Sequence, residues 1–341
     1  MRSYCSVINT GIALLLAVLI VLMACSSIEP DDPVVVEPTA TPFATTTRST
    51  IINAGSVNLN TPSLPEYSPT IAYGDQPNQF GQLRTPGLLP PEAIPPHSPF
   101  PIVVLIHGGF WKDSFDLGLM APLAADLSGR GYATWNLEYR GVGSSAGGWP
   151  ETAEDIAAGI DHLALIADEH GLDLGRVIVI GHSAGGQLAL WAAARAHLPE
   201  CAPGRDTVVR PVAVVSLAGV NDLESADQNN QGAGAVERFL GRNVDRNALY
   251  LESSSAALLP LGIPVLLVHG DEDGNVPISQ TSDYAAKARE AGDVVEVLTV
   301  PGGDHFVVID PSSGAWADIV ERLPLLLAPG STQTPGGLTG P

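Results

Sequence analysis

Residues 177–194 read "VIVIGHSAGGQLALWAAA", and this stretch decides the fold. Four β-branched residues lead directly into Gly-His-Ser-Ala-Gly-Gly, after which helix-forming residues begin. The pattern predicts a buried strand, a sharp turn that carries Ser183, and a helix. Gly181 and Gly185 flank the serine, as a strained and crowded turn requires. A serine in this position is a candidate nucleophile, because the turn presents it at the end of a sheet.

A second serine has the same spacing of glycines. Residues 143–147 read "GSSAG", with Ser145 at the centre. No strand pattern precedes Ser145, and the glycine-rich stretch around it ends at Pro150. We therefore expect Ser145 to lie in a turn and Ser183 to be the reactive residue.

Short apolar runs alternate with helical patterns between about residue 70 and residue 328, the predicted catalytic domain. Because these runs are continuously apolar, they predict a mostly parallel central sheet flanked by helices, the arrangement of an α/β protein. Residues 71–86 are expected to form an antiparallel hairpin at one edge, and Pro324 is expected to break or kink the last helix. The candidate strands are 102–107, 132–139, 176–181, 212–218, 264–270 and 294–300, and the candidate helices are 116–129, 152–169, 184–197, 280–291 and 313–327.

Residues 221–260 interrupt this alternation. They are rich in Asn, Gln, Ser and Gly, with one short candidate helix at 232–241. An insertion that follows a strand of a parallel sheet lies above the carboxyl edge, where ligands bind. We expect a small cap that offers little apolar wall to a substrate.

A reactive serine needs a base and an acid that orients the base. In hydrolases that carry the serine on such a strand–turn–helix, the acid and then the histidine follow the serine along the chain, on loops after later strands. The stretch "PVLLVHGDEDGNVP" (264–277) offers Asp271, Glu272 and Asp273 as acids, and "VVEVLTVPGGDHF" (294–306) offers His305 as the base. Asp222, after another strand, is an alternative acid.

The stretch "IVVLIHGGFW" (102–111) predicts a strand followed by a glycine-rich turn. Glycines let backbone N–H groups approach a substrate oxygen, as in esterases with a His-Gly-Gly loop. The predicted oxyanion hole combines the amide of Ala184 with that of Gly109 or Phe110. Trp111 is interpreted as a packing residue, and three histidines at strand ends are interpreted as structural: His107, His182 and His269.

Four motifs, "HGGFW", "GHSAGGQLALW", "HGDEDGNVP" and "GGDHF", occur in this order. Together they resemble the α/β-hydrolase fold of the esterase/lipase group, close to carboxylesterase-like and kynurenine-formamidase-like members, over about residues 70–329. The resemblance implies that Ser183 is the nucleophile, Asp273 the acid and His305 the base. In this family the aspartate lies four positions after the histidine of "HG", which selects Asp273 over Asp271.

The resemblance implies a serine hydrolase that cleaves short-chain carboxylic esters through an acyl-enzyme, with no metal and no organic cofactor. The "HGGFW" motif also keeps open an amidase, arylformamidase or peptidase that uses the same residues. A non-catalytic surface binding protein on a hydrolase scaffold is a third interpretation. Such a protein would usually have lost one of Ser183, Asp273 and His305, and none is missing.

The N-terminus predicts a lipid-anchored protein. Arg2 precedes the apolar run "GIALLLAVLIVLMA" (11–24), which is shorter than the roughly 20 residues of a membrane span and is typical of a signal peptide over 1–24. "LMAC" (22–25) resembles the lipobox of bacterial lipoproteins, so Cys25 is the predicted lipidation site. We expect an extracytoplasmic, membrane-anchored protein, with simple secretion or an uncleaved anchor as alternatives. Residues 25–69 and 329–341 are predicted to be a Pro/Thr-rich tether and a flexible tail.

Charge and cysteine content exclude several other functions. The net charge is −21 without a basic run, which disfavours nucleic acid as a partner. The three cysteines form neither a disulfide framework nor zinc spacing, and Cys201 is interpreted as an inert residue without a partner. Residues 271–275 carry too few acidic residues for a calcium loop.

Overall fold

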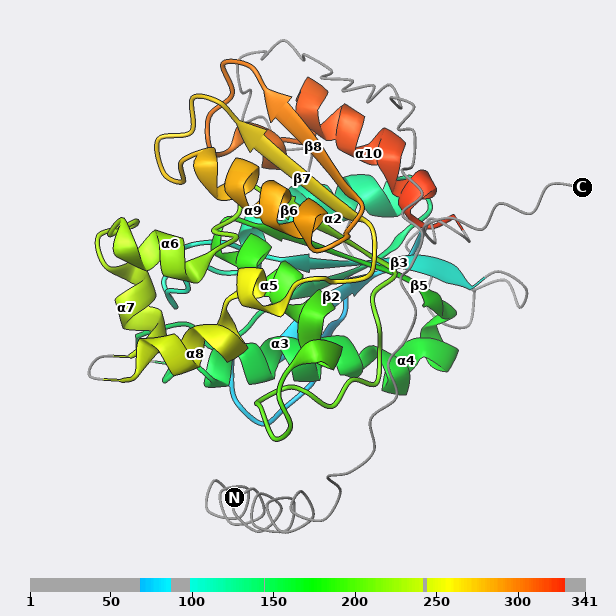
Figure 1. The fold of residues 1–341 in the computed structure, drawn as a ribbon. Coiled ribbons are helices and arrows are strands. Elements are labelled where there is room, and N and C mark those ends of the chain that lie inside the picture. Colours follow the sequence, from blue (N-terminus) through cyan, green and yellow to red (C-terminus); the bar gives the residue numbers. More distant parts are fainter. Residues whose placement is uncertain (1–67, 87–98, 144, 242–243, 329–341) are drawn as a thin grey trace, which may run out of the picture. The chain divides into compact units, whose positions relative to one another are not determined.

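The computed structural model describes residues 68–86, 99–143, 145–241 and 244–328 (Figure 1). In this part of the chain an eight-stranded sheet has the order β1-β2-β4-β3-β5-β6-β7-β8. β1 and β2 form an antiparallel hairpin at one edge, and β3 to β8 run parallel, as predicted. The strands are β1 (Thr70–Ala72), β2 (Phe80–Arg84), β3 (Phe100–Ile106), β4 (Ala133–Leu137), β5 (Leu172–His182), β6 (Ala213–Leu217), β7 (Val265–Gly270) and β8 (Val295–Val300).

Helices cover both faces of the sheet. Side chains of β3 alternate between two buried clusters: Val104 packs with residues of α3, α4, α5 and α9, and Val103 packs with residues of α2 and α10. Burial on both faces explains the continuous apolar runs of the strands. These helices are α2 (Ala121–Gly129), α3 (Glu151–Asp161), α4 (Leu163–His170), α5 (Ala184–Ala194), α9 (Ser279–Glu290) and α10 (Gly314–Leu326), and short 3-10 helices occur at Leu117–Leu119, Arg195–His197 and Val307–Ile309.

Two helix predictions need correction. The helix expected over 152–169 is divided into α3 and α4, because the backbone tightens at His162, whose carbonyl accepts a hydrogen bond from Leu165 three residues later. The helix does not break at Pro324, because α10 continues to Leu326, and the expected alternative of a kink stays a prediction. Pro324 lies in the last turn of that helix.

The insertion between β6 and β7 is a small helical cap. It consists of α6 (Leu223–Gln228), α7 (Ala235–Leu240), α8 (Arg246–Ser253) and a 3-10 helix over Ser255–Leu258. α7 confirms the helix expected at 232–241, whereas α6 and α8 were not predicted. In Figure 1 the cap helices lie on the side toward which the arrowheads of β7 and β8 point. The cap is therefore next to the carboxyl edge of the parallel strands, as expected.

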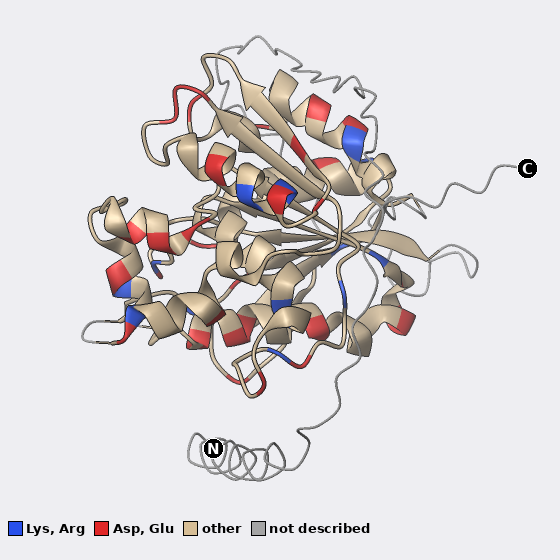
Figure 2. Ribbon diagram, viewed as in Figure 1, with Lys and Arg blue, Asp and Glu red and all other residues tan. Residues whose placement is uncertain are grey.

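The acidic excess of the chain is spread over its surface. Asp and Glu number 37 against 16 Lys and Arg. In Figure 2 the acidic positions are distributed over helices on both sides of the sheet and over the cap, with Lys and Arg interspersed. The charge therefore does not mark one binding area in this view.

None of the described helices combines the length and the apolar composition that a membrane crossing needs. The predicted signal peptide, Cys25, the tether and the 329–341 tail lie outside the described residues.

Candidate active site

Ser183 occupies a strained turn between β5 and α5. Its φ of 56° and ψ of −120° lie in a region that L-residues rarely adopt, and the side chain is almost completely buried. A methyl group on Gly181 would lie 1.9 Å from the carbonyl oxygen of Gly185, and one on Gly185 would lie 2.2 Å from that of Ile106. Only glycine fits at both flanks, as the sequence predicted. Strain of this kind is concentrated at functional sites.

Backbone hydrogen bonds fasten this turn to the end of β6. The amide of Ser183 donates to the carbonyl of Leu217 at 2.8 Å, and the amide of Val220 donates to the carbonyl of Ser183 at 3.2 Å. Gly186, in the first turn of α5, lies so close that an added methyl group would meet Ser216 Oγ at 2.5 Å. The position of Ser183 is therefore set by two strands and a helix.

Asp273 and His305 come together on the loops that follow β7 and β8. His305 Nδ1 lies 2.6 Å from Asp273 Oδ2, and both side chains are buried. The other carboxylate oxygen, Oδ1, accepts hydrogen bonds from the amides of Asn275 and Val276 at 2.7 and 2.9 Å. The carboxylate thus holds the imidazole through Nδ1 and leaves Nε2 for other contacts. This pair is the one that the resemblance selected.

The surroundings of Asp273 keep its carboxylate ionised. Burial by itself would raise the pKa of Asp273, but hydrogen bonds from His269, His305 and the Val276 amide lower this pKa well below its ordinary value. An ionised carboxylate accepts the Nδ1–H of a histidine and stabilises the imidazolium form.

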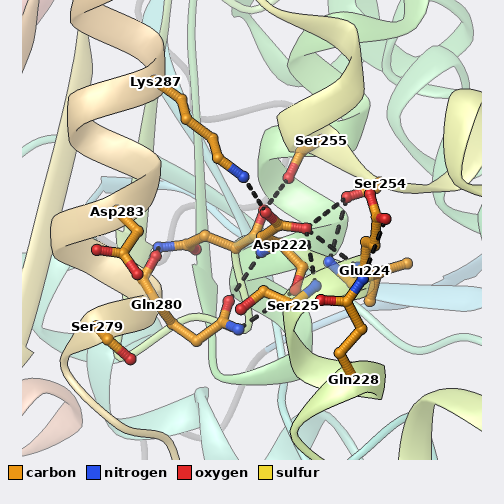
Figure 3. Close-up of polar contacts among 12 residues, drawn as sticks. Asp222, Glu224, Ser225, Gln228, Ser254, Ser255, Ser279, Gln280, Asp283 and Lys287 are labelled. Atoms are coloured by element: carbon orange, nitrogen blue, oxygen red, sulfur yellow. Dashed lines mark hydrogen bonds and ion pairs between the residues drawn. The ribbon is translucent and has the colours of Figure 1, made fainter.

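The alternative acids make other contacts. Asp222 Oδ1 caps α6 by accepting from the amides of Glu224 and Ser225, and its Oδ2 accepts from Lys287 Nζ at 2.6 Å (Figure 3). Its backbone amide donates to Gln280 Oε1 at 2.8 Å. Asp271 accepts from the Gly302 amide at 2.6 Å. Asp222 therefore joins the cap to α9, and the carboxylate that contacts His305 is that of Asp273.

The predicted oxyanion loop lies against Ser183. A methyl group on Gly108 would lie 2.9 Å from Ser183 Cβ. The next three residues, Gly109, Phe110 and Trp111, all have positive φ angles, of 110°, 53° and 57°. Such a turn can direct successive amides toward one point. Ala184 begins α5, and the first amides of a helix have no partner within it.

Trp111 fixes this loop to the cap and to α5. Its ring stacks on Phe239 of α7 with centroids 4.7 Å apart, and its Nε1 donates to Gln187 Oε1 at 3.1 Å. Gln187 Nε2 donates in turn to the carbonyl of Ser253 at 2.8 Å. Trp111 is completely buried, which confirms its interpretation as a packing residue. The role of Gln187 had no signal in the sequence, because its partners lie far along the chain.

Two of the strand-end histidines have structural contacts, as expected. His182 Nε2 donates to the carbonyl of His305 at 3.0 Å, and burial lowers the pKa of His182 to about 3. Neutral His182 therefore ties the turn at Ser183 to the loop that carries His305. His107 contacts the Glu138 carboxylate at 3.2 Å and stacks on Tyr139.

Ser145 lies in a turn, as predicted. Its Oγ donates to the carbonyl of Gly141 at 2.7 Å, and its amide donates to Asp113 Oδ2. Cys201 is disulfide-bonded, so the expectation that it has no partner is wrong. Among the described residues no group of three or more His, Cys, Asp or Glu side chains is arranged to hold a metal ion.

Comparison with known proteins identifies the family. The model of the BD-FAE family matches residues 91–288, more than half of the chain. The chain belongs to the BD-FAE family. Its fold is the α/β-hydrolase fold, which it shares with esterase B from Lactobacillus rhamnosis. The two structures superimpose with a TM-score of 0.65 at 22% sequence identity, and the match covers 77% of this chain and 86% of esterase B.

Curated relatives are also similar over most of the domain. Esterase LipC of Mycobacterium tuberculosis is 26% identical over 251 residues, which are 70% of this chain and 60% of LipC. Esterase LipQ of the same organism is 27% identical over 240 residues, 68% of this chain and 55% of LipQ. The chain thus spans a little more than half the length of these relatives.

The neutral state of His182 predicts acid-dependent stability. An unfolded histidine takes up a proton near pH 6.5, whereas His182 in the folded protein does so only near pH 3. Between these values the unfolded state binds more protons, so the free energy of unfolding decreases as the pH is lowered, by up to about 1.4 kcal/mol per pH unit. Urea unfolding at pH 7 and pH 5 measures this decrease, and His182→Gln should reduce it.

The exposed His197 provides the matched control. His197→Gln should leave the pH dependence of unfolding as it is in the unaltered protein. An equal pH dependence in His182→Gln and the unaltered protein would contradict the assignment of His182 as a buried neutral group.

Proposed function

We propose that the protein is a serine hydrolase that cleaves short-chain carboxylic esters. The observation that carries the proposal is the strained turn of Ser183 at the carboxyl edge of the sheet, where the preceding residue, His182, donates to the carbonyl of His305. His305 belongs to a buried pair with Asp273 on the loops that follow β7 and β8. A nucleophile, a base and an orienting acid on these loops are the components of acyl transfer. The esterase names of LipC and LipQ are consistent with this chemistry.

In the proposed reaction Ser183 Oγ attacks the ester carbonyl while His305 Nε2 takes the hydroxyl proton. The amides of Ala184 and of Gly109 or Phe110 bind the oxyanion that forms. Collapse of this intermediate expels the alcohol, which receives the proton from His305, and leaves an acyl group on Ser183. Water then attacks the acyl-enzyme with His305 again as the base, which releases the carboxylic acid and restores the serine.

Apolar surface near the site is limited in extent. The apolar side chains of the cap helices are mostly buried against the domain, including Leu223, Val236 and Phe239. Phe306, 47% exposed, packs edge-on against His305, and Phe115, 41% exposed, packs against Gly109. These rings offer contact area to short acyl or aryl groups, whereas a long acyl chain gains affinity only by burying many CH₂ groups.

The assignment of the nucleophile is tested with two serine variants. Ser183→Ala should lower kcat by about 10⁴ to 10⁶, because no other group can form the acyl-enzyme. Ser145→Ala should stay within about tenfold of the unaltered protein, since its hydroxyl only closes a turn. A fluorophosphonate probe followed by peptide mass spectrometry should label Ser183. Labelling of Ser145 would show that the assignment is wrong.

Substrate class is tested with a panel of p-nitrophenyl esters from acetate to laurate and a formanilide of matched size. Acetate to butyrate should give the highest kcat/KM, with no activation at a lipid–water interface, because little apolar wall is available. A preference for chains beyond about ten carbons would contradict the small acyl site. A higher kcat/KM for the formanilide would favour the amidase alternative instead.

We further propose that the protein is attached to the bacterial cell membrane through lipid on Cys25. The support is the sequence pattern of residues 1–25. The chain has cysteines only at 5, 25 and 201, so the proposal assigns the disulfide of Cys201 to the unprocessed chain and leaves Cys201 without a second cysteine of the same chain after cleavage and lipidation. Several acyl chains together give firm attachment, because each buried CH₂ contributes about 0.8 kcal/mol. Cys25→Ser should abolish metabolic labelling with a fatty acid and leave the precursor uncleaved. Mass spectrometry that found Met1 at the N-terminus of the unaltered protein would contradict the proposal.

A further inference from the structure

The carboxylate of Asp273 contacts two histidines, of which the proposed reaction uses only one. Its Oδ2 lies 2.6 Å from His305 Nδ1 and 3.2 Å from His269 Nε2. His269 is completely buried at the end of β7, four residues before Asp273. The sequence analysis interpreted His269 only as a structural residue of the strand end.

The partners of His269 determine which ring nitrogen carries its proton. Nε2 lies 2.9 Å from the carbonyl oxygen of Val276, which can only accept a hydrogen bond. Nε2 must therefore carry a hydrogen, which it can share with Asp273 Oδ2. Nδ1 is then the acceptor, and Thr281 Oγ1 of α9 lies 2.8 Å from it as the donor.

Further hydrogen bonds hold Thr281 in this role. Asn221 Nδ2 lies 3.4 Å from Thr281 Oγ1 and donates to it, so the hydroxyl hydrogen remains for His269. Asn221 Oδ1 accepts from Ser216 Oγ at 2.7 Å. Ser216 lies in β6 and packs against Gly186, which is in the first turn of α5 directly after Ser183. A continuous chain of buried polar contacts thus runs from Ser216, which packs against Gly186, through Asn221, Thr281 and His269 to Asp273.

We propose that His269 is a positioning residue: its Nε2–H, fixed by Thr281, holds the Asp273 carboxylate so that Oδ2 receives the Nδ1–H of His305. The proposal rests on the proposed function, since it assigns His269 a part in the same reaction. His269 touches no reacting atom in this arrangement. It restrains rotation of the carboxylate, whose Oδ1 is already held by the amides of Asn275 and Val276.

Loss of this donor should change kcat and leave substrate binding nearly unaltered. A small misplacement of a catalytic group can lower the rate by about 10²-fold, whereas His269 is not placed to contact substrate. Thr281→Val removes the hydroxyl at almost constant volume, and His269→Phe removes both ring nitrogens. Both variants should lower kcat about 10- to 100-fold and change KM less than about threefold. His269→Gln, which restores a donor near Nε2, should recover most of this loss.

Thr134→Val is the matched control for Thr281→Val. Thr134 is a completely buried threonine of β4, and its hydroxyl has no hydrogen-bond partner within the described part of the chain. Thr134→Val should therefore leave kcat and KM unchanged. Thermal unfolding of each variant identifies any that do not fold, and Thr281→Val provides the test if His269→Phe is one of these.

A spectroscopic measurement separates positioning from a purely structural role. The hydrogen shared by His305 Nδ1 and Asp273 gives a far-downfield proton NMR resonance, observable without substrate. This resonance should shift in Thr281→Val and His269→Phe and stay in place in Thr134→Val. An unshifted resonance overturns the proposal, whether or not kcat falls, and so does a kcat of folded Thr281→Val equal to that of Thr134→Val.

The two proposals fail in different ways. If Ser183→Ala retains full activity, the proposed function is wrong, and the NMR resonance still tests the contact between His269 and Asp273. If Ser183→Ala is inactive but Thr281→Val behaves as Thr134→Val does, only the role of His269 is wrong.

Discussion

The strained backbone at Ser183 is the constraint on which the rest of the site depends. A residue in this conformation costs about 1–3 kcal/mol and persists only where its surroundings leave no alternative. Here the amide of Ser183 is bonded to Leu217 at the end of β6 and its carbonyl to Val220 just after that strand. Gly181 and Gly185 allow α5 to approach β5 and β3 closely. The packing of β3, β5 and β6 therefore stabilises a turn that the local sequence alone would not hold.

The parallel sheet then brings the remaining groups to the same edge. Asp273 and His305 are 32 residues apart in the chain, yet β7 and β8 are neighbours and end at the same level. Burial strengthens the hydrogen bond between them, because a carboxylate that is shielded from water interacts more strongly with its donors. The low pKa of Asp273 reflects these donors, which outweigh the effect of burial.

The sequence predicted the parts of this site that depend on local order. Residue patterns within short stretches of the sequence predict the strand–turn–helix at Ser183, the glycine-rich turn after β3 and the parallel sheet. Choosing Asp273 over Asp271 needed the family resemblance, since both carboxylates follow the same strand. The contact of His269 with Asp273 and the role of Gln187 could not be predicted, because each depends on tertiary packing. The division between α3 and α4 was not predicted, because a break of one residue hardly changes the helical spacing of the apolar residues.

The stack of Trp111 on Phe239 has a consequence for redesign of the cap. Helix α7 supplies the ring of Phe239 on which Trp111 of the predicted oxyanion loop stacks, and the carbonyl of Ser253 at the end of α8 accepts a hydrogen bond from Gln187. The cap is thus not an independent module that could be exchanged freely between hydrolases of this fold. A cap grafted from another enzyme would have to supply both an aromatic ring for Trp111 and an acceptor for Gln187, or the transplant would disturb the loop beneath it.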